Sequence, residues 1–375
     1  MTTVIESALG AADAALFLQS PADVSRAAKA WRKAPVIGID TEFVRERTYR
    51  ADLGLVQLSD GHTVWLVDPL VDENLTQVKA LLEDHSVIKL LHSPSEDLEV
   101  FRNDMDVIPR PMVDTQAACA LLGQPLQLAY HAAAKWLLDV EVAKDQTRSN
   151  WLRRPLSRGQ LRYAALDVCL LPEMWRRLKH NLEQRGRLDW LHEDCERQLR
   201  VAADGVPDDQ AWARIRGVTR LDGSGLAVIR RLAAWRENEA RMRNLPRGFV
   251  LPDAVLLQVA LGRITSEARL KEVDGLHRRM LERYGSSVVA MVSEVIASGE
   301  TIPEIRPLDS SAKQALNKLR ESIKKQASIL DIDPALLASR RELESALRDS
   351  PETWPDKFDG WRGRYVTEPL KEWAA

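Results

Sequence analysis

Short runs of hydrophobic residues in the first half of the chain predict a β-sheet. Residues 36–43 form a near-continuous apolar run with the length of a buried strand. Two further runs are joined through Asp60-Gly61, a dipeptide typical of hairpin turns. The predicted strands are 36–43, 53–59, 63–67, 87–91 and a short fifth at 111–114.

Helix-start signals lie between and after these runs. Ser93 is a predicted N-cap, with Pro94 at the first helical position and Glu96 completing a capping box. Ser157 and Gln160 predict a second start, and Pro172 should end or kink that helix. Helices that fill the gaps between strands, one pair of which forms a hairpin, predict an α/β fold: a mixed sheet flanked by helices.

The rest of the chain has helical patterns. A segment rich in proline and acidic residues at 300–309 predicts a linker, and helices are predicted at 310–330 and 333–348. Three tryptophans near the end could stack on bases, but packing of a small helical domain is the more typical use. They are Trp354, Trp361 and Trp373.

Composition indicates an ordinary soluble globular protein. Of 375 residues, 45% are hydrophobic and 29% are charged, which suits two or three domains. Cys119, Cys169 and Cys195 are far apart, so we expect buried thiols and neither a disulfide framework nor a zinc site. No stretch approaches ~18 consecutive apolar residues, and no signal peptide is recognisable. We therefore expect a cytoplasmic protein without membrane contact.

Candidate chemistry begins with two carboxylates on the first predicted strand. Asp40 and Glu42 are two residues apart, so their side chains point to the same face of the strand. Acids at a strand end can simply face solvent. Asp97, in the first turn of the predicted helix after Ser93, could be a partner of the helix dipole. Tyr163 and Asp167 share one helix face, although a packed tyrosine beside a solvated aspartate is the ordinary interpretation.

Taken together, these five residues have one economical explanation. Mg²⁺ and Mn²⁺ prefer oxygen ligands, and two such ions ~4 Å apart can clamp the attacking and leaving oxygens of a phosphoryl displacement. That mechanism needs no nucleophilic serine or cysteine, and no supporting signature for one is found. His92, Gln57 and Asp114 lie near the same predicted sheet edge but are assigned no chemistry; Asp114 is expected to cap a helix.

The motifs around these residues resemble those of ribonuclease D, a member of the DEDD superfamily of 3′→5′ exonucleases. Tyrosine stands four residues before the last acid, and Arg162 occupies the place where a sister subclass has histidine, so the resemblance is to the tyrosine subclass. Ser93-Pro94 departs from the more usual Ala-Gly of the family. The three motifs are Ile39-Asp40-Thr41-Glu42-Phe43, Leu91-His92-Ser93-Pro94-Ser95-Glu96-Asp97-Leu98 and Tyr163-Ala164-Ala165-Leu166-Asp167-Val168.

The resemblance implies a ribonuclease H-like fold and a role for each residue. Asp40 would bridge two Mg²⁺ or Mn²⁺ ions, Glu42 and Asp167 would complete the site of the ion that activates water, and Asp97 would support the second ion. Tyr163 would orient the attacking water, since a phenol with a pKa of ~10 is a poor base near neutral pH.

The implied activity is hydrolysis of the 3′-terminal phosphodiester of RNA, releasing nucleoside 5′-monophosphates. tRNA precursors and other structured RNAs would be the substrates, with no obligate protein partner. Two alternatives remain open, a DNA 3′→5′ exonuclease on the same fold and a non-catalytic RNA-binding protein. The segment 144–151, including Arg148, is either a loop that contacts the substrate backbone or a solvated loop.

Positive charge is concentrated in one later segment. Residues 210–250 contain nine arginines and three acids, a net charge of +6 in a chain whose net charge is −2. This is a candidate phosphate-binding surface, although a solvated helix face is an equal alternative on charge alone. The segments 230–236 and 244–249 resemble an HRDC domain, and Arg230, Arg231, Arg236 and Arg247 are its candidate RNA-binding residues.

The resemblances imply three domains. The exonuclease domain would cover 1–200, an all-α HRDC domain 207–290, and a second, more divergent HRDC-like helical domain 300–375.

Overall fold

The computed structural model describes residues 2–142, 149–205, 207–304, 308–348 and 354–374. The chain divides into two units. The first contains Met1–Val44, Asp52–Ala203 and Leu308–Ala375, and the second contains Arg45–Ala51 and Asp204–Pro307. The C-terminal helical segment therefore belongs to the same unit as the sheet.

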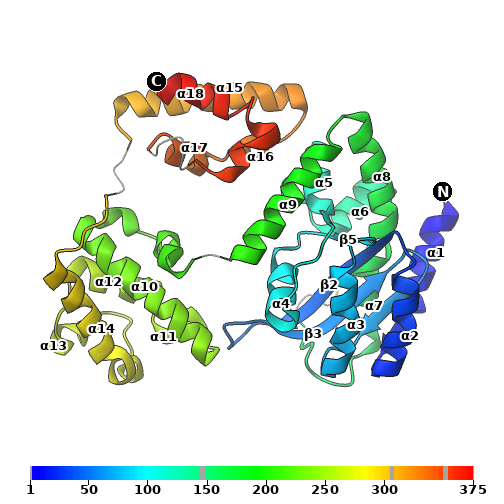
Figure 1. Ribbon diagram of the computed structural model, residues 1–375, viewed down its shortest axis with the longest axis horizontal. Coiled ribbons are helices and arrows are strands. Elements are labelled where there is room, and N and C mark those ends of the chain that lie inside the picture. The colour runs from blue at the N-terminus through cyan, green and yellow to red at the C-terminus, as the bar shows by residue number, and fades with distance from the viewer. Residues whose placement is uncertain (1, 143–148, 206, 305–307, 349–353, 375) are drawn as a thin grey trace. The chain divides into compact units, whose positions relative to one another are not determined.

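A six-stranded mixed sheet organises the first unit (Figure 1). Its strand order is β1-β4-β3-β2-β5-β6. The central strand β2 pairs antiparallel with β3 and parallel with β5, which confirms the expected mixed sheet. The strands are β1 (Leu16–Leu18), β2 (Val36–Val44), β3 (Asp52–Ser59), β4 (Val64–Val67), β5 (Ile88–Leu91) and β6 (Met112–Asp114). The three-residue edge strand β1 had no predicted counterpart.

Helices flank the sheet, and α7 packs on β2, β3 and β4. The glycine at position 38 of β2 allows this close approach, because a Cβ there would lie 2.9 Å from Leu171 Cβ and 3.0 Å from the Val168 oxygen. The helices are α1 (Thr2–Asp13), α2 (Pro21–Trp31), α3 (Asp72–Glu83), α4 (Ser95–Met105), α5 (Thr115–Leu121), α6 (Tyr130–Leu138), α7 (Arg158–Cys169), α8 (Leu171–Gln184) and α9 (Leu188–Asp204).

The two predicted helix starts had different outcomes. Ser157 caps α7 in a complete capping box with Gln160, and Pro172 falls in the first turn of α8 just after α7 ends. The prediction that Ser93 is an N-cap was wrong. Ser93 has a φ of 63°, its N–H donates to Asp114 Oδ1 at 3.0 Å, and Pro94 precedes the first residue of α4. The pairing with Asp114 holds the chain in a turn before the helix begins.

Four helices form the C-terminal segment of the first unit: α15 (Ser310–Leu330), α16 (Pro334–Leu337), α17 (Arg340–Ala346) and α18 (Thr367–Ala374). The helix predicted at 310–330 is confirmed. The helix predicted at 333–348 is instead broken into α16 and α17, because Ala338 is extended and Ser339 starts a new capping box with Glu342.

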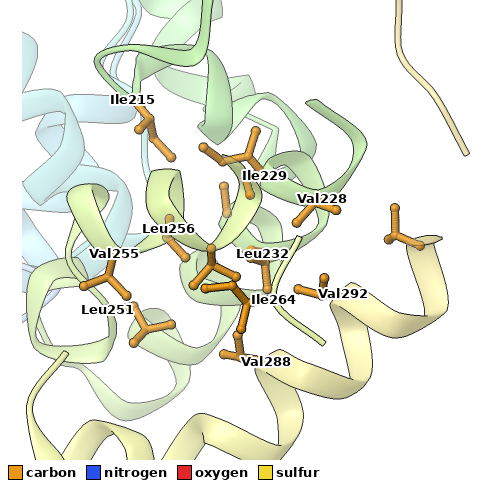
Figure 2. Close-up of a cluster of buried hydrophobic side chains, with 14 of the residues drawn as sticks. Ile215, Val228, Ile229, Leu232, Leu251, Val255, Leu256, Ile264, Val288 and Val292 are labelled. Carbon is orange, nitrogen blue, oxygen red and sulfur yellow. The ribbon is translucent and has the colours of Figure 1, made fainter. Parts of the chain in front are cut away.

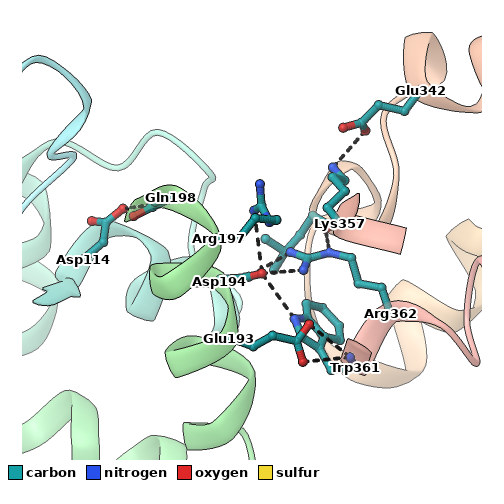
Figure 3. A network of polar contacts seen from close by, with 10 residues as sticks. Asp114, Glu193, Asp194, Arg197, Gln198, Glu342, Lys357, Trp361 and Arg362 are labelled. Carbon is teal, nitrogen blue, oxygen red and sulfur yellow. Dashed lines mark hydrogen bonds and ion pairs between the residues drawn. The ribbon is translucent and has the colours of Figure 1, made fainter. Parts of the chain in front are cut away.

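A buried ion pair joins this segment to α9 (Figure 3). Arg362 Nη2 lies 2.8 Å from Asp194 Oδ2, and the two side chains are only 2% and 5% exposed. Beside the pair, the indole of Trp361 stacks on that of Trp190 with ring centroids 4.3 Å apart. The expectation that the tryptophans pack is confirmed for Trp361, while the Trp354 Nε1–H donates to the Ala346 oxygen. The Trp373 side chain lies outside the described residues.

The second unit is helical and has its own hydrophobic core (Figure 2). In this core, Val228 and Leu232 of the helix Gly223–Arg243 pack with Val288 and Val292 of the helix Arg278–Ser298. Its helices are α10 (Gly223–Arg243), α11 (Arg247–Val250), α12 (Asp253–Gly262), α13 (Glu267–Leu270) and α14 (Arg278–Ser298), preceded by 3-10 turns at Asp208–Arg214 and Val218–Arg220.

Two whole-chain expectations concern membranes and thiols. Among the described residues, no helix combines the length and apolarity needed to cross a membrane. The three cysteines are free and buried, as expected.

The buried pair between Asp194 and Arg362 predicts an asymmetric response to substitution. Arg362→Met should lower the free energy of unfolding by about 3 kcal/mol, because it leaves the Asp194 carboxylate buried without its partner. Arg340→Met removes an exposed ion pair with Glu344 and should cost about 0.5 kcal/mol or less. Urea unfolding of the full chain measures both, and equal losses would contradict this account of the interface.

Candidate active site

Three carboxylates from two elements converge on one face of the sheet. Asp40 and Glu42 lie inside β2 and not at its end, since pairing with β3 continues to Val44. Asp167 comes from α7, which packs on that strand. One carboxylate oxygen from each of Asp40, Glu42 and Asp167 lies within 4.8 Å of the others, and all three side chains are partly buried. The alternative of a solvated strand end is therefore excluded.

Asp97 is placed differently from these three. It lies in the first turn of α4, is 7% exposed, and is not one of the three acids that share the 4.8 Å cluster. Its Oδ1 accepts hydrogen bonds from the Thr41 N–H at 3.1 Å and the Thr41 hydroxyl at 2.5 Å. The sequence analysis did not assign Thr41 a role. Its position between the two acids of the motif was the one sequence feature that could have indicated a polar contact. This threonine fixes the second-motif acid to the first-motif strand.

Burial raises the pKa values of all four acids, and repulsion from the other site acids adds to this for Asp40 and Glu42. Desolvation is the largest cause for each of them. The pKa of Asp40 rises well above its ordinary value, and repulsion from Asp97, Asp167 and Glu42 adds to the desolvation. The pKa of Glu42 rises to about 8, and those of Asp97 and Asp167 rise to about 6. At neutral pH such a group of acids lacks a cation that would stabilise the ionised carboxylates.

The residues present fit divalent metal ions. Carboxylate oxygens are the ligands that Mg²⁺ and Mn²⁺ prefer, and a cation would remove the repulsion that raises the pKa values. Gln57 stands directly opposite Asp40 on β3, is fully buried, and has no hydrogen-bond partner for either amide atom among the described residues. A buried amide without partners beside the acids indicates a site that bound water or ligand completes.

Tyr163 projects from α7 one helical turn before Asp167. Its hydroxyl is close enough to the Asp167 carboxylate to lower the pKa of that acid against the effect of burial. Desolvation, followed by repulsion from Asp167 and Glu42, raises the pKa of Tyr163 above its ordinary value of 10.0. The phenol therefore stays protonated at neutral pH, which suits a group that orients a water molecule better than one that removes its proton.

His92 and Asp114 have structural partners. His92 Nδ1 lies 2.9 Å from the Thr115 hydroxyl and Nε2 lies 2.7 Å from the Leu128 oxygen, so both ring nitrogens are engaged. Asp114 caps α5, as expected, by accepting from the Gln116 N–H at 2.9 Å. Leaving both residues out of the chemistry is consistent with these contacts.

The candidate RNA-binding arginines of the second unit are all paired. Arg230 and Arg231 face Glu300 and Glu294. Arg247 pairs with Glu237 and lies over the ring of Tyr49, 4.9 Å from its centroid. These arginines can bind RNA phosphates only if they release their carboxylate partners.

Arg236 has to be withdrawn from that set. It is 3% exposed, donates to the Leu251 oxygen at 3.0 Å and pairs with Asp253 at 2.6 Å. Its position on the inner face of α10 makes it a structural residue, which the charge count alone did not reveal.

The polar segment 144–151 lies mostly outside the described residues. At its described end Asn150 is exposed, whereas Trp151 is only 2% exposed and therefore not solvated.

The mixed sheet and its acidic cluster define a 3′-5′ exonuclease, and residues 17–183 match the 3′-5′ exonuclease family. Residues 225–292 match the HRDC domain.

Ribonuclease D of Pseudomonas paraeruginosa is 35% identical over 364 residues, covering 94% of this chain and 96% of that protein. Ribonuclease D of Escherichia coli K12 is 33% identical over 355 residues, covering 91% and 93%. The chain belongs to the ribonuclease D family, whose members are hydrolytic 3′-5′ exoribonucleases. The crystal structure of Escherichia coli RNase D, an exoribonuclease involved in structured RNA processing, superposes with a TM-score of 0.87 at 31% identity, covering 96% of this chain and 98% of that one.

The raised pKa of Glu42 predicts how metal-free stability depends on pH. Between about 4.5 and 8 the folded chain retains a proton on Glu42 that the unfolded chain has lost, so this group's contribution to stability falls as pH rises through that window. In EDTA at pH 8, Glu42→Gln should therefore be more stable than the unsubstituted protein by about 1–3 kcal/mol.

Urea unfolding at several pH values measures this difference, which should vanish below the ordinary pKa of glutamate. Adding Mn²⁺ should stabilise the unsubstituted protein more than the variant, because the variant lacks one anionic ligand. A stability difference that does not change with pH would show that Glu42 is not held in a strained, metal-free site.

Proposed function

We propose that Asp40, Glu42, Asp97 and Asp167 hold two divalent ions, Mg²⁺ or Mn²⁺, and that this site hydrolyses the 3′-terminal phosphodiester of RNA. The products are nucleoside 5′-monophosphates, released one at a time. The observation that carries the proposal is the convergence of Asp40, Glu42 and Asp167 oxygens within 4.8 Å. Family membership supplies the reaction class, and the acidic cluster supplies a place for it in this chain.

Two bound ions would supply charge neutralisation at the scissile phosphate and a lowered pKa for the attacking water. Asp40 would serve both ions, because its carboxylate lies in the cluster with Asp167 and is near enough to Asp97 for their repulsion to raise its pKa. Tyr163, one helical turn before Asp167 on α7, would orient the attacking water with its hydroxyl. Asp97, already fixed by Thr41, would support the second ion. No side chain forms a covalent intermediate in this scheme.

Structured RNAs, including tRNA precursors, are the proposed substrates, acted on in the cytoplasm without an obligate protein partner. The Escherichia coli relative is described as acting in structured RNA processing, which supports this class of substrate. Residues 1–200 would carry catalysis, 207–290 would bind RNA as an HRDC domain, and 300–375 would form a C-terminal, HRDC-like helical domain.

The metal site predicts separable effects on cleavage and binding. Asp40→Asn and Asp167→Asn should each lower Mg²⁺-dependent shortening of a 3′-tailed RNA by at least about 10³-fold, because each removes an anionic ligand that no neighbour replaces. Dissociation constants for the same RNA should stay within about 2-fold, since phosphate contacts elsewhere dominate affinity. Full activity in either variant would remove the two-metal assignment.

The same assay discriminates between RNA and DNA. Oligonucleotides of matched sequence, one of each chemistry, should be shortened from the 3′ end at rates that favour RNA. A preference for DNA would instead support the DNA exonuclease alternative, and no release of mononucleotides from either would support a binding protein.

The pairing of the arginines predicts a ranking among them. Arg214, Arg216 and Arg220 are exposed and form no ion pair among the residues that the structure describes. Changing these three to Ala should weaken RNA binding about 10-fold and reduce the salt slope by about 2. Arg230/Arg231→Ala should act in the same direction but more weakly, because Glu294 and Glu300 already compete with RNA for these side chains.

Fluorescence anisotropy with a labelled RNA at several salt concentrations measures both effects. Arg26→Ala, at a side chain 76% exposed on α2, is the control for a general loss of positive charge. If the triple variant, the Arg230/Arg231 variant and the Arg26 control weakened RNA binding equally, a localised binding surface on the second unit would be contradicted.

A further inference from the structure

The segment that leads into α7 is anchored by one arginine. The Arg154 guanidinium donates to Asp68 from Nε at 2.7 Å and from Nη2 at 2.6 Å. It also donates from Nη1 to the Trp151 oxygen at 2.7 Å and from Nη2 to the Gly54 oxygen at 2.8 Å. One side chain thus joins β3, the residue after β4 and the segment that precedes α7.

The chemistry of this anchor requires an arginine. The Asp68 side chain is 6% exposed and that of Arg154 is 21% exposed, so the bidentate pair is largely removed from water. A planar fork with several N–H groups can reach one carboxylate and two carbonyls together, whereas an ammonium group is a point charge. The four contacts therefore fix both the position and the direction of the 151–154 backbone.

Trp151 transmits this position to the active site. Its ring lies against that of Tyr163, with centroids 6.2 Å apart and an angle of 33° between the planes. On the other side its backbone meets β3, where a Cβ at Gly54 would lie 2.6 Å from Trp151 Cβ and 2.8 Å from the Trp151 oxygen. The sheet prevents Trp151 from moving inward, and Arg154 holds its carbonyl so that it does not move outward.

We propose that Arg154, together with Asp68, is a positioning residue for the exonuclease reaction. It holds Trp151 as a wall for the ring of Tyr163, which stands one helical turn before Asp167 on α7. The inference rests on the water-orienting role proposed for Tyr163. Loss of the anchor would leave the acids in place but would widen the range of Tyr163 orientations, so it should slow the chemical step without weakening RNA binding.

The test is a double-substitution cycle on the full chain with a 3′-tailed RNA and Mg²⁺. Arg154→Met should lower kcat about 10-fold and leave KM within about 2-fold. In the Tyr163→Phe background the same substitution should lower kcat by less than about 2-fold, because the hydroxyl that Arg154 positions is already absent. Arg154→Lys keeps the charge without the fork, and it repeats the cycle if the methionine variant is not folded at the assay temperature.

A matched control comes from α8. Arg177 pairs with Glu173 at exposures of 22% and 7%, close to those of Arg154 and Asp68, and it also donates to the Leu137 oxygen. Arg177→Met should lower the melting temperature to a similar degree but leave kcat within about 2-fold in both backgrounds.

Two results would overturn the inference: an unchanged kcat in the folded Arg154→Met or Arg154→Lys protein, or a full 10-fold loss that persists in the Tyr163→Phe background. A different result, in which Tyr163→Phe alone leaves kcat unchanged, would refute the proposed role of Tyr163 itself. The failure of the inference and the failure of the proposed function can therefore be told apart.

Discussion

Repulsion among buried carboxylates is the constraint on which the rest of this structure depends. One oxygen of each of Asp40, Glu42 and Asp167 is held within 4.8 Å of the others, where burial opposes ionisation of all three and repulsion adds to it for Asp40 and Glu42. Such an arrangement persists only when the surrounding structure fixes the acids independently. Here the fully buried β2 core residues Ile37 and Ile39 and the close packing of α7 over Gly38 supply that rigidity. The resulting deficit of positive charge is what makes the site suited to cations.

The alternation of side chains along one strand lets neighbouring residues of the motif engage two different helices. Asp40 and Glu42 face α7, whereas Thr41 between them holds Asp97 of α4. All three residues of the motif are therefore engaged, two through their acids and one through a hydroxyl. The second-motif acid is fixed by the first-motif strand, which explains how elements 56 residues apart in sequence keep one geometry.

The helical second unit shows how ion pairs limit an argument from charge. Its excess of arginine is real, but Arg236 is buried and Arg230, Arg231 and Arg247 face carboxylates. An arginine that is already paired contributes less binding free energy when it meets a phosphate, because it must first release its carboxylate partner. We therefore propose the exposed arginines of the preceding turns, more than those of α10, as the RNA-binding residues of this unit.

Local signals in the sequence determined the strands of the sheet, the capping box at Ser157 and the spacing of the site residues, because turns, caps and periodicity act over a few neighbouring residues. The tertiary structure decided what depends on distant partners. Ser93 donates to Asp114 and does not cap a helix, and Asp97 accepts from the Thr41 hydroxyl. Arg154 binds the Trp151 carbonyl, and the Trp151 ring packs against Tyr163. Burial of Arg236 belongs to the same group. Hydrogen bonds and ion pairs between distant segments form only where packing brings their atoms within reach, and no local pattern encodes that proximity.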